Sequence, residues 1–281
     1  MPETGHRIPD GADRTTAAAA TMAHLRRLPR PVYGHINGLP NIAIPRRHRH
    51  PWAQLSYATQ GYLQVWTPHA RFVALAQRAV WIPAGVPHQV RQSPQTVIRS
   101  LYLDADALAL DWPACRVLAV SPLLHELIRQ FGTLPVEYEP DGPDGRLARV
   151  LADQIAVSQD AGLILPWPTD TRLQSVCRQL QVHPDTAPDL GTFSQRLGVS
   201  DKTLTRLFRQ QTGLGFRLWR QRARLVHALP LLERGDRITD VALACGYDSL
   251  SSFIAAFRAH TGLTPRAFAA GAHDDDPAPA G

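Results

Sequence analysis

Two stretches decide the fold: residues 190–214 read LGTFSQRLGVSDKTLTRLFRQQTGL, and residues 238–263 read ITDVALACGYDSLSSFIAAFRAHTGL. The second stretch repeats the first at an offset of 48 residues up to Gly198 and Gly246, and of 49 residues beyond them. Each copy predicts a short helix, a tight turn at the glycine and a second helix, because glycine permits a turn in which a Cβ would clash. The repeat therefore predicts two helix-turn-helix units.

The second helix of the first unit has two unlike faces. Leucine and phenylalanine recur at helical spacing over 200–211, and Ser200 is the expected N-cap; Asp248 or Ser249 is expected to cap the other unit. The opposite face carries Lys202, Thr205, Arg206 and Arg209. Such a face suits base edges and phosphates in a major groove. A solvated surface helix is the alternative, which two copies in one basic segment disfavour.

A single long helix is expected between the units, over 216–233, and it carries four arginines: Arg217, Arg220, Arg222 and Arg224. It would hold the two second helices at a fixed separation, about 34 Å if they enter successive major grooves. Pro230 is expected to kink this helix or to lie near its end.

Charge is concentrated in the same third of the chain. Residues 172–268 hold 14 basic and 7 acidic side chains, whereas residues 1–171 hold 16 and 14, and the net charge of the chain is +6. A basic segment behind a nearly neutral one predicts a polyanion-binding module attached to another domain.

Composition bounds the class of protein. The chain has 281 residues with 44% hydrophobic and 19% charged residues, which is typical of globular domains. Cys115, Cys177 and Cys245 lack the paired spacing of a disulfide framework or a zinc ribbon. No stretch has the length of a membrane span and no secretory apolar run is present, so we expect a cytoplasmic, nucleoid-associated protein without a membrane partner.

The first half predicts an antiparallel barrel or jelly roll. Short β-type runs lie at 53–59, 62–67, 71–75 and 96–103, with turns at Gln60-Gly61 and Pro83-Ala84-Gly85 and no helical segment between them. The fold class is therefore α+β. Amphipathic helices follow near 121–131, capped by Ser121, and 145–157. They could pack only on the barrel or on their copies in a homodimer, and we favour the homodimer.

The basic third resembles the DNA-binding domain of the AraC/XylS family of bacterial transcriptional regulators, over about residues 173–268. The matching segments are Leu197-Gly198-Val199-Ser200, Leu204-Thr205-Arg206-Leu207-Phe208, Ile238-Thr239-Asp240-Val241-Ala242, Cys245-Gly246-Tyr247 and Thr261-Gly262-Leu263-Thr264-Pro265. The resemblance implies that both second helices read double-stranded DNA, through Lys202, Thr205 and Arg206 in the first and Leu250, Ser251 and Ala255 in the second.

The second set departs from the polar residues that are frequent in the family. Leu250 and Ala255 can contact thymine methyl groups but cannot hydrogen-bond a base edge. We therefore expect the first unit to carry most of the base discrimination. The second would mainly position the domain, through Ser249, Ser251, Ser252 and Arg258.

A histidine pattern lies at the start of the predicted barrel. His48, His50 and Gln54 form H-x-H-x-x-x-Q, and Pro83, Gly85 and His88 form P-x-G-x-x-H. These segments resemble the two cupin motifs, whose histidines and carboxylate hold a metal, with Gln54 in the carboxylate position. Three imidazoles suit a divalent transition metal, the candidate cofactor. Pocket lining without metal and a purely structural role are the alternatives, and nearby aromatics are candidate pocket walls: Trp52, Tyr57, Trp66 and Trp81.

These features predict a sequence-specific transcriptional regulator, not an enzyme, controlled by a small-molecule or metal effector in the barrel, with RNA polymerase as a candidate partner. The alternatives are a cupin-type metalloenzyme with an accessory nucleic-acid-binding domain and an architectural DNA binder. The expected organisation is a mobile arm (1–31), a cupin-like effector-binding and dimerisation domain (32–165), a linker (166–171), the double helix-turn-helix domain (172–268) and an acidic tail (269–281).

Overall fold

The computed structural model describes residues 27–34, 46–94 and 96–271, so most of the expected arm and nearly all of the acidic tail lie outside the described residues. The strands are β1 (Val32–Gly34), β2 (Ala53–Ala58), β3 (Tyr62–Trp66), β4 (Ala70–Leu75), β5 (Arg78–Ile82), β6 (Gln89–Gln92), β7 (Ile98–Leu103), β8 (Arg116–Ala119) and β9 (Leu163–Pro166). The helices are α2 (Pro122–Phe131), α3 (Pro143–Ala156), α4 (Thr171–Val182), α5 (Leu190–Leu197), α6 (Asp201–Thr212), α7 (Phe216–Glu233), α8 (Ile238–Ala244), α9 (Leu250–Thr261) and α10 (Pro265–Gly271). None of the helices in these ranges is long and apolar enough to cross a membrane.

The strands form two antiparallel sheets that face each other. One has the order β1-β7-β2-β5-β8 and the other the order β6-β3-β4-β9. Aliphatic side chains from both sheets, such as Leu63, Val65 and Ile82, are fully buried between them. The interior is therefore filled by side chains, and the predicted α+β class is confirmed.

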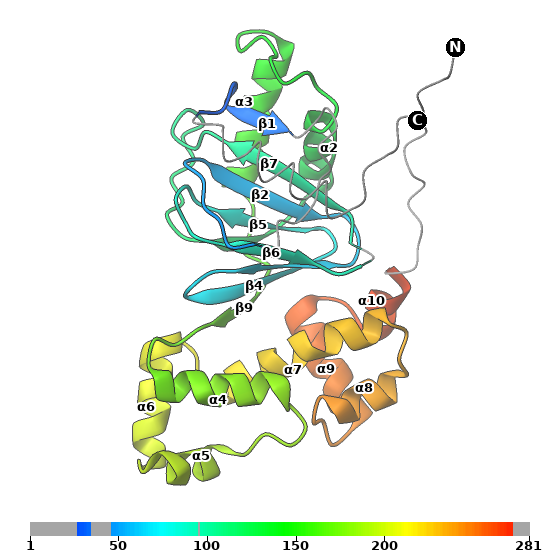
Figure 1. Cartoon of the computed structure of the whole chain (residues 1–281). Helices are drawn as coiled ribbons and strands as arrows, with labels where there is room; N and C mark the ends of the chain where they lie inside the picture. Colours follow the sequence, from blue (N-terminus) through cyan, green and yellow to red (C-terminus); the bar gives the residue numbers. More distant parts are fainter. Residues whose placement is uncertain (1–26, 35–45, 95, 272–281) are drawn as a thin grey trace, which may run out of the picture.

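Helices α2 and α3 cover the outer face of the five-stranded sheet (Figure 1). Ser121 caps α2 as predicted, and its hydroxyl accepts the Leu124 N–H at 3.1 Å. The apolar stripes of both helices are buried against the sheet, with Leu123 and Val150 left 51% and 41% exposed. Because the barrel itself covers these stripes, they do not require a second chain.

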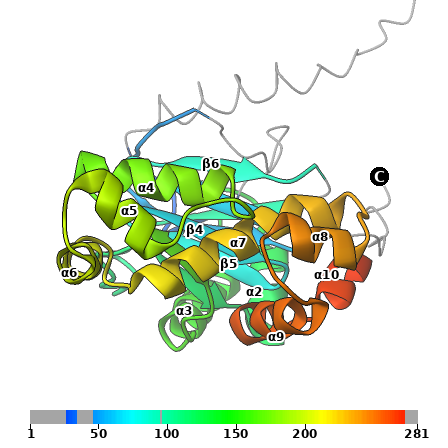
Figure 2. The same ribbon diagram turned by 90° about the horizontal axis from the view of Figure 1, so that it is seen from below.

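The helical half packs on the outer face of the four-stranded sheet (Figures 1 and 2). Tyr62, Val73, Leu75, Leu163 and Leu165 from that face share one apolar core with buried residues of α4 and α7. The segment 163–166, where no strand was predicted from the sequence, is the edge strand β9, paired with β4. The two halves thus meet across a continuous core.

Polar contacts reinforce this junction. The Trp219 indole donates to the Pro166 carbonyl at 2.8 Å, and Arg222 donates to the Ile164 carbonyl at 2.9 Å. The Ser93 hydroxyl donates to Glu233, and Arg78 donates to the Thr261 carbonyl. The last two bonds tie the end of α7 and the end of α9 to the barrel.

The sequence repeat is also a repeat of hydrogen bonds. The Thr212 hydroxyl lies 2.8 Å from the Phe208 carbonyl and accepts the Leu214 N–H at 3.2 Å. Thr261 makes the same contacts with the Phe257 carbonyl, at 2.7 Å, and the Leu263 N–H, at 3.2 Å. Both threonines are buried and precede a left-handed glycine that ends the helix. Each hydroxyl therefore closes the end of a second helix.

Thr212→Val and Thr261→Val should each lower the free energy of unfolding by about 1–3 kcal/mol, because valine keeps the shape but leaves buried backbone groups without a partner. Chemical denaturation of the full chain measures the loss. Thr133→Val, at an exposed threonine that donates to one carbonyl, is the control and should change stability by less than about 0.5 kcal/mol. Losses no larger than the control's would show that the two hydroxyls are dispensable.

Candidate nucleic-acid interface and metal centre

The second helix of each unit, α6 and α9, begins with the same cap. Ser200 accepts the Thr203 N–H, and Ser249 accepts the Ser252 N–H, both at 3.2 Å. Between α5 and α6 the chain turns through Gly198 at φ +65°, and between α8 and α9 through Gly246 at φ +75°. The left-handed backbone at both positions explains why each unit needs glycine.

Every residue predicted to face DNA has an exposed side chain. On α6 the apolar face is buried through Leu204 and Phe208, and on α9 through Phe253 and Phe257. The exposed residues are Lys202, Thr205, Arg206 and Arg209 on α6, and Leu250, Ser251, Ser252, Ala255 and Arg258 on α9. The barrel covers neither helix on this side, so both faces are open to a partner.

The two open faces differ in chemistry. Helix α6 presents three cations, whereas α9 presents small and apolar side chains with Arg258 in its last turn. The Ser252 hydroxyl is engaged at the cap, where it donates to the Ser249 carbonyl at 2.8 Å. Ser251 makes no hydrogen bond within the described part of the chain and keeps its hydroxyl for a partner.

Helix α7 holds the two units, and three of its four arginines serve the fold. Arg220 donates to the Ala187 carbonyl at 2.8 Å, Arg222 reaches β9, and the Arg224 guanidinium lies 5.4 Å from the Tyr247 ring centre. Burial lowers the pKa of Arg220 and of Arg222. Part of the positive charge of the basic third is therefore structural and does not face a partner. Pro230 lies inside α7, one turn before its end at Glu233.

The structure brings the three predicted histidines together. His48 and His88 form an isolated antiparallel bridge, with backbone N···O distances of 2.9 and 2.8 Å. The ring nitrogens of His48, His50 and His88 that could bind an ion lie within 4.8 Å of one another. Trp52, one of the predicted pocket walls, stacks on the His50 ring at 5.3 Å between centres.

Backbone carbonyls define which imidazole nitrogen carries the proton. The Nδ1 atoms of His48, His50 and His88 lie 2.9, 2.7 and 2.8 Å from the carbonyls of Arg46, Trp52 and Val86. A carbonyl only accepts, so each Nδ1 must be the protonated nitrogen. The three Nε2 atoms are then left with lone pairs, which is the state a metal ligand needs.

Electrostatics agree with that protonation state. Burial lowers the pKa of all three imidazoles, and it brings that of His88 to about 3, with the neighbouring His48 contributing. The rings therefore stay neutral at physiological pH.

Gln54 is the fourth member of the cluster and has two usable orientations. Its Oε1 lies 3.0 Å from His50 Nε2 and 3.2 Å from His88 Nε2. In this orientation the lone pairs of the oxygen and of the two nitrogens repel each other unless a cation lies between them. After a 180° amide flip, the amide nitrogen would donate to both imidazoles and the oxygen would accept from Ser56, 2.8 Å away. The donor set therefore fits a divalent ion in one orientation, and in the other Gln54 satisfies the Nε2 atoms of His50 and His88 without metal.

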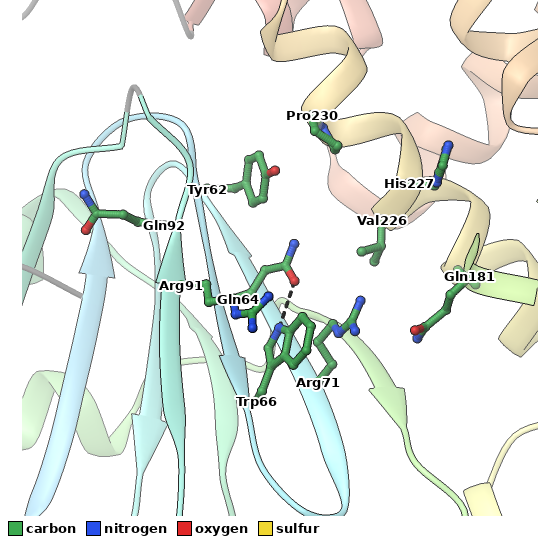
Figure 3. Close-up of a pocket in the computed structure, with 11 residues that line it drawn as sticks. Tyr62, Gln64, Trp66, Arg71, Arg91, Gln92, Gln181, Val226, His227 and Pro230 are labelled. Carbon is green, nitrogen blue, oxygen red and sulfur yellow. Dashed lines mark hydrogen bonds between the residues drawn. The ribbon is translucent and has the colours of Figure 1, made fainter. Parts of the chain in front are cut away.

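The other predicted wall aromatics lie elsewhere. The Tyr57 hydroxyl lies 2.7 Å from His125 Nδ1 on α2, a partner that the sequence did not indicate. Trp81 is fully buried in the core under α2 and α3. Trp66 lies on the sheet face that meets the helical half, between Arg71 and Arg91 (Figure 3). Neither arginine was singled out from the sequence. Side chains alternate between the two faces of a sheet, and both arginines lie on the same face as Trp66.

Both halves of the chain match known protein families. A model of the AraC-like ligand binding domain matches residues 31–211, and a helix-turn-helix domain model matches residues 193–271. The HTH-type transcriptional regulator NimR of Escherichia coli K12 is 31% identical over 218 residues, which cover 78% of this chain and 80% of that protein. The HTH-type transcriptional regulator RipA of Corynebacterium glutamicum is 34% identical over 125 residues, covering 44% and 36%. A solved AraC-type regulator from Chromobacterium violaceum covers 36% of this chain and 92% of its own, with 27% identity and a TM-score of 0.35.

Equilibrium dialysis against Zn²⁺, Ni²⁺, Fe²⁺ and Cu²⁺ tests the histidine cluster. We expect the full chain to retain about one ion, His88→Ala to lose it, and Gln54→Glu to bind more tightly because a carboxylate adds negative charge to the donor set. His69→Ala, outside the cluster, is the control. If the unmodified chain retains no ion, the cluster does not bind metal, and the hydrogen-bonded network around Gln54 is its resting state.

Proposed function

Because the chain belongs to the AraC family of DNA-binding transcriptional regulators with a ligand-binding domain, we propose that it reads a specific DNA sequence through α6 and α9. The observation that carries this proposal is the pair of capped second helices whose outer faces are exposed while their apolar faces are buried. A helix open along one face and fixed along the other is what entry into a major groove requires.

The two helices would divide the work. Lys202, Thr205 and Arg206 on α6 offer donors to bases and phosphates, and arginine can make a bidentate contact with guanine. On α9, Leu250 and Ala255 would contact thymine methyl groups, and Arg258 would contact a phosphate. Helix α7, at 18 residues, sets the separation of the two units.

We propose further that the barrel half binds an effector, a small molecule or a metal ion. Three neutral imidazoles and Gln54 support a divalent transition metal as one candidate. An ion bound there would be coordinated by His48, His50, His88 and the Gln54 amide oxygen. A self-satisfied network supports the other candidate, a histidine site that lines a pocket without metal.

An effector must favour one arrangement of the two halves in order to regulate. The apolar junction between the four-stranded sheet and helices α4 and α7 is the natural element to shift, because it joins the barrel to α7, the helix that holds both units. RNA polymerase would be the downstream partner of a chain bound beside a promoter.

We also propose a homodimer through α2 and α3, although the barrel covers the apolar stripes of both helices. The exposed apolar residues on or next to these helices are Leu123, Val150 and Val157. A cupin-type metalloenzyme remains the alternative function, and turnover of a substrate by the full chain would favour it.

DNA selected from a random pool by the full chain provides the ligand for a binding test. Arg206→Ala should weaken binding by about 1–3 kcal/mol and relax preference at one position, because a bidentate base contact is lost. Ser251→Ala should weaken binding modestly and equally on all sequences, and leave base preference intact, because a positioning contact is lost. Fluorescence anisotropy over a salt series measures both affinity and the number of phosphate contacts.

The control for this test is Arg149→Ala on α3, which removes the same charge from an exposed position on the barrel half. Equal losses of base preference in the α6 and α9 variants would contradict the division of work. Binding that shows no sequence preference would favour the architectural alternative.

The dimer is tested by sedimentation velocity at micromolar concentration. Leu123→Asp and Val150→Asp should shift the chain from dimer toward monomer, because a buried charge at an interface is costly. Val97→Asp, an exposed valine in the loop before β7, should leave the distribution unchanged. A monomeric unmodified chain would contradict the homodimer.

A further inference from the structure

A crevice lies at the junction of the two halves, between the outer face of β3, β4 and β6 and helices α4 and α7 (Figure 3). Its volume is about 330 Å³, the size of a small-molecule site. The residues that line it are Tyr62, Gln64, Trp66, Arg71, Arg91, Gln92, Gln181, Ala223, Val226, His227 and Pro230. None of these is a carboxylate.

The sheet side of the crevice concentrates positive charge on one aromatic ring. The guanidinium carbons of Arg71 and Arg91 lie 3.8 and 4.1 Å from the centre of the Trp66 ring. Trp66 is itself held by a hydrogen bond from its indole N–H to Gln64 at 3.0 Å (Figure 3). The sheet register places Arg71 opposite Trp66 and Arg91 opposite Gln64, so the cluster is built by neighbouring strands and not by a mobile loop.

These two arginines lack a counter-ion within the described ranges. Neither makes an ion pair or a hydrogen bond there, and the pKa of Arg71 is lowered to about 10 by burial and by the charge of Arg91. The other arginine–tryptophan stack of the barrel differs: Arg116, 4.4 Å from the Trp112 ring, also pairs with Asp160 at 2.9 Å. Arg91 is exposed and Arg71 is half-buried, so water and the Trp66 ring offset part of their mutual repulsion, and an anionic ligand would offset more of it.

The helix side offers one unsatisfied donor and an apolar wall. Gln181 of α4 carries a buried side-chain nitrogen without a hydrogen-bond partner, and it faces Arg71 across the crevice (Figure 3). Ala223, Val226 and Pro230 of α7 form the apolar wall. An adjoining hollow of about 350 Å³ shares Trp66, Arg71 and Gln181 and adds a further cation, Arg178.

We propose that this crevice binds a small organic carboxylate, with its anionic group held by Arg71, Arg91 and Gln181 and its apolar body against α7. Guanidinium groups and an amide N–H are the donors that carboxylates select. The apolar wall favours a carboxylate with an organic body over inorganic phosphate.

Such a ligand would touch both halves of the chain at once. It would therefore stabilise the arrangement in which the helical half packs on the barrel, and it would compete with any state that separates them. The regulatory consequence rests on the proposed function, whereas binding in the crevice does not.

Thermal unfolding of the full chain tests binding at constant ionic strength. Millimolar benzoate and phenylacetate should raise the Tm by several degrees, and neutral benzamide should not. Arg71→Met and Gln181→Leu should lose most of that shift. Without ligand, Arg71→Met should melt no lower than the unmodified chain, because it removes the repulsion, whereas the matched control Arg116→Met should retain the full shift with carboxylate.

The proposal is overturned if no carboxylate raises the Tm, if Arg71→Met responds as the unmodified chain does, or if only inorganic phosphate gives an Arg71-dependent shift. A separate arm measures affinity for pool-selected DNA with and without benzoate, where we expect at least a threefold change that Arg71→Met abolishes. Absence of DNA binding alongside a retained carboxylate shift would refute the regulator and leave the crevice. An unchanged DNA affinity alongside a retained shift would overturn its regulatory role.

Discussion

The burial of helix α7 is the constraint on which the rest of the structure depends. Its apolar residues Trp219, Leu225, Leu229 and Leu232 are fully buried, and the helix contacts α4, α6, α8, α9, α10 and β9. The same rod therefore spaces the two helix-turn-helix units and joins them to the barrel. A change at the barrel face reaches both units through one element, which is a requirement for coupling by rigid packing.

The role of the unusual polar groups around that junction follows from their position beside its apolar contacts. Its core contacts are apolar and do not themselves require a ligand. The arginine pair on Trp66 and the unpartnered nitrogen of Gln181 lie at the edge of this apolar contact, where a ligand can reach them. In the proposed ligand-dependent junction, the apolar core stays constant and the incomplete polar edge is the part that a ligand would complete.

The histidine cluster shows how one substitution changes the chemistry of a site. With a carboxylate at position 54, three neutral imidazoles would have no donor to share and would depend on a cation. The amide of Gln54 can turn either its oxygen or its nitrogen toward His50 and His88. The same four side chains are therefore compatible with a bound ion and with none, and the sequence leaves both interpretations open.

The sequence by itself determined the local structure wherever its pattern had a backbone cause. The repeat, the cap Ser200, the glycine turns and the bounds 216–233 all follow from backbone hydrogen bonding and helical periodicity, which act within a few residues, whereas the structure chose Ser249 over Asp248 as the second cap. Strands β1, β5, β6, β8 and β9 and helices α4 and α10 were not predicted, and for the strands the reason is that short strands take their identity from partners far along the chain. Only the tertiary structure decided that α2 and α3 pack on the barrel, that three arginines of α7 serve the fold, and that Arg71, Arg91 and Gln181 meet. Those pairings join residues up to about a hundred positions apart, and long-range packing is not encoded in local periodicity.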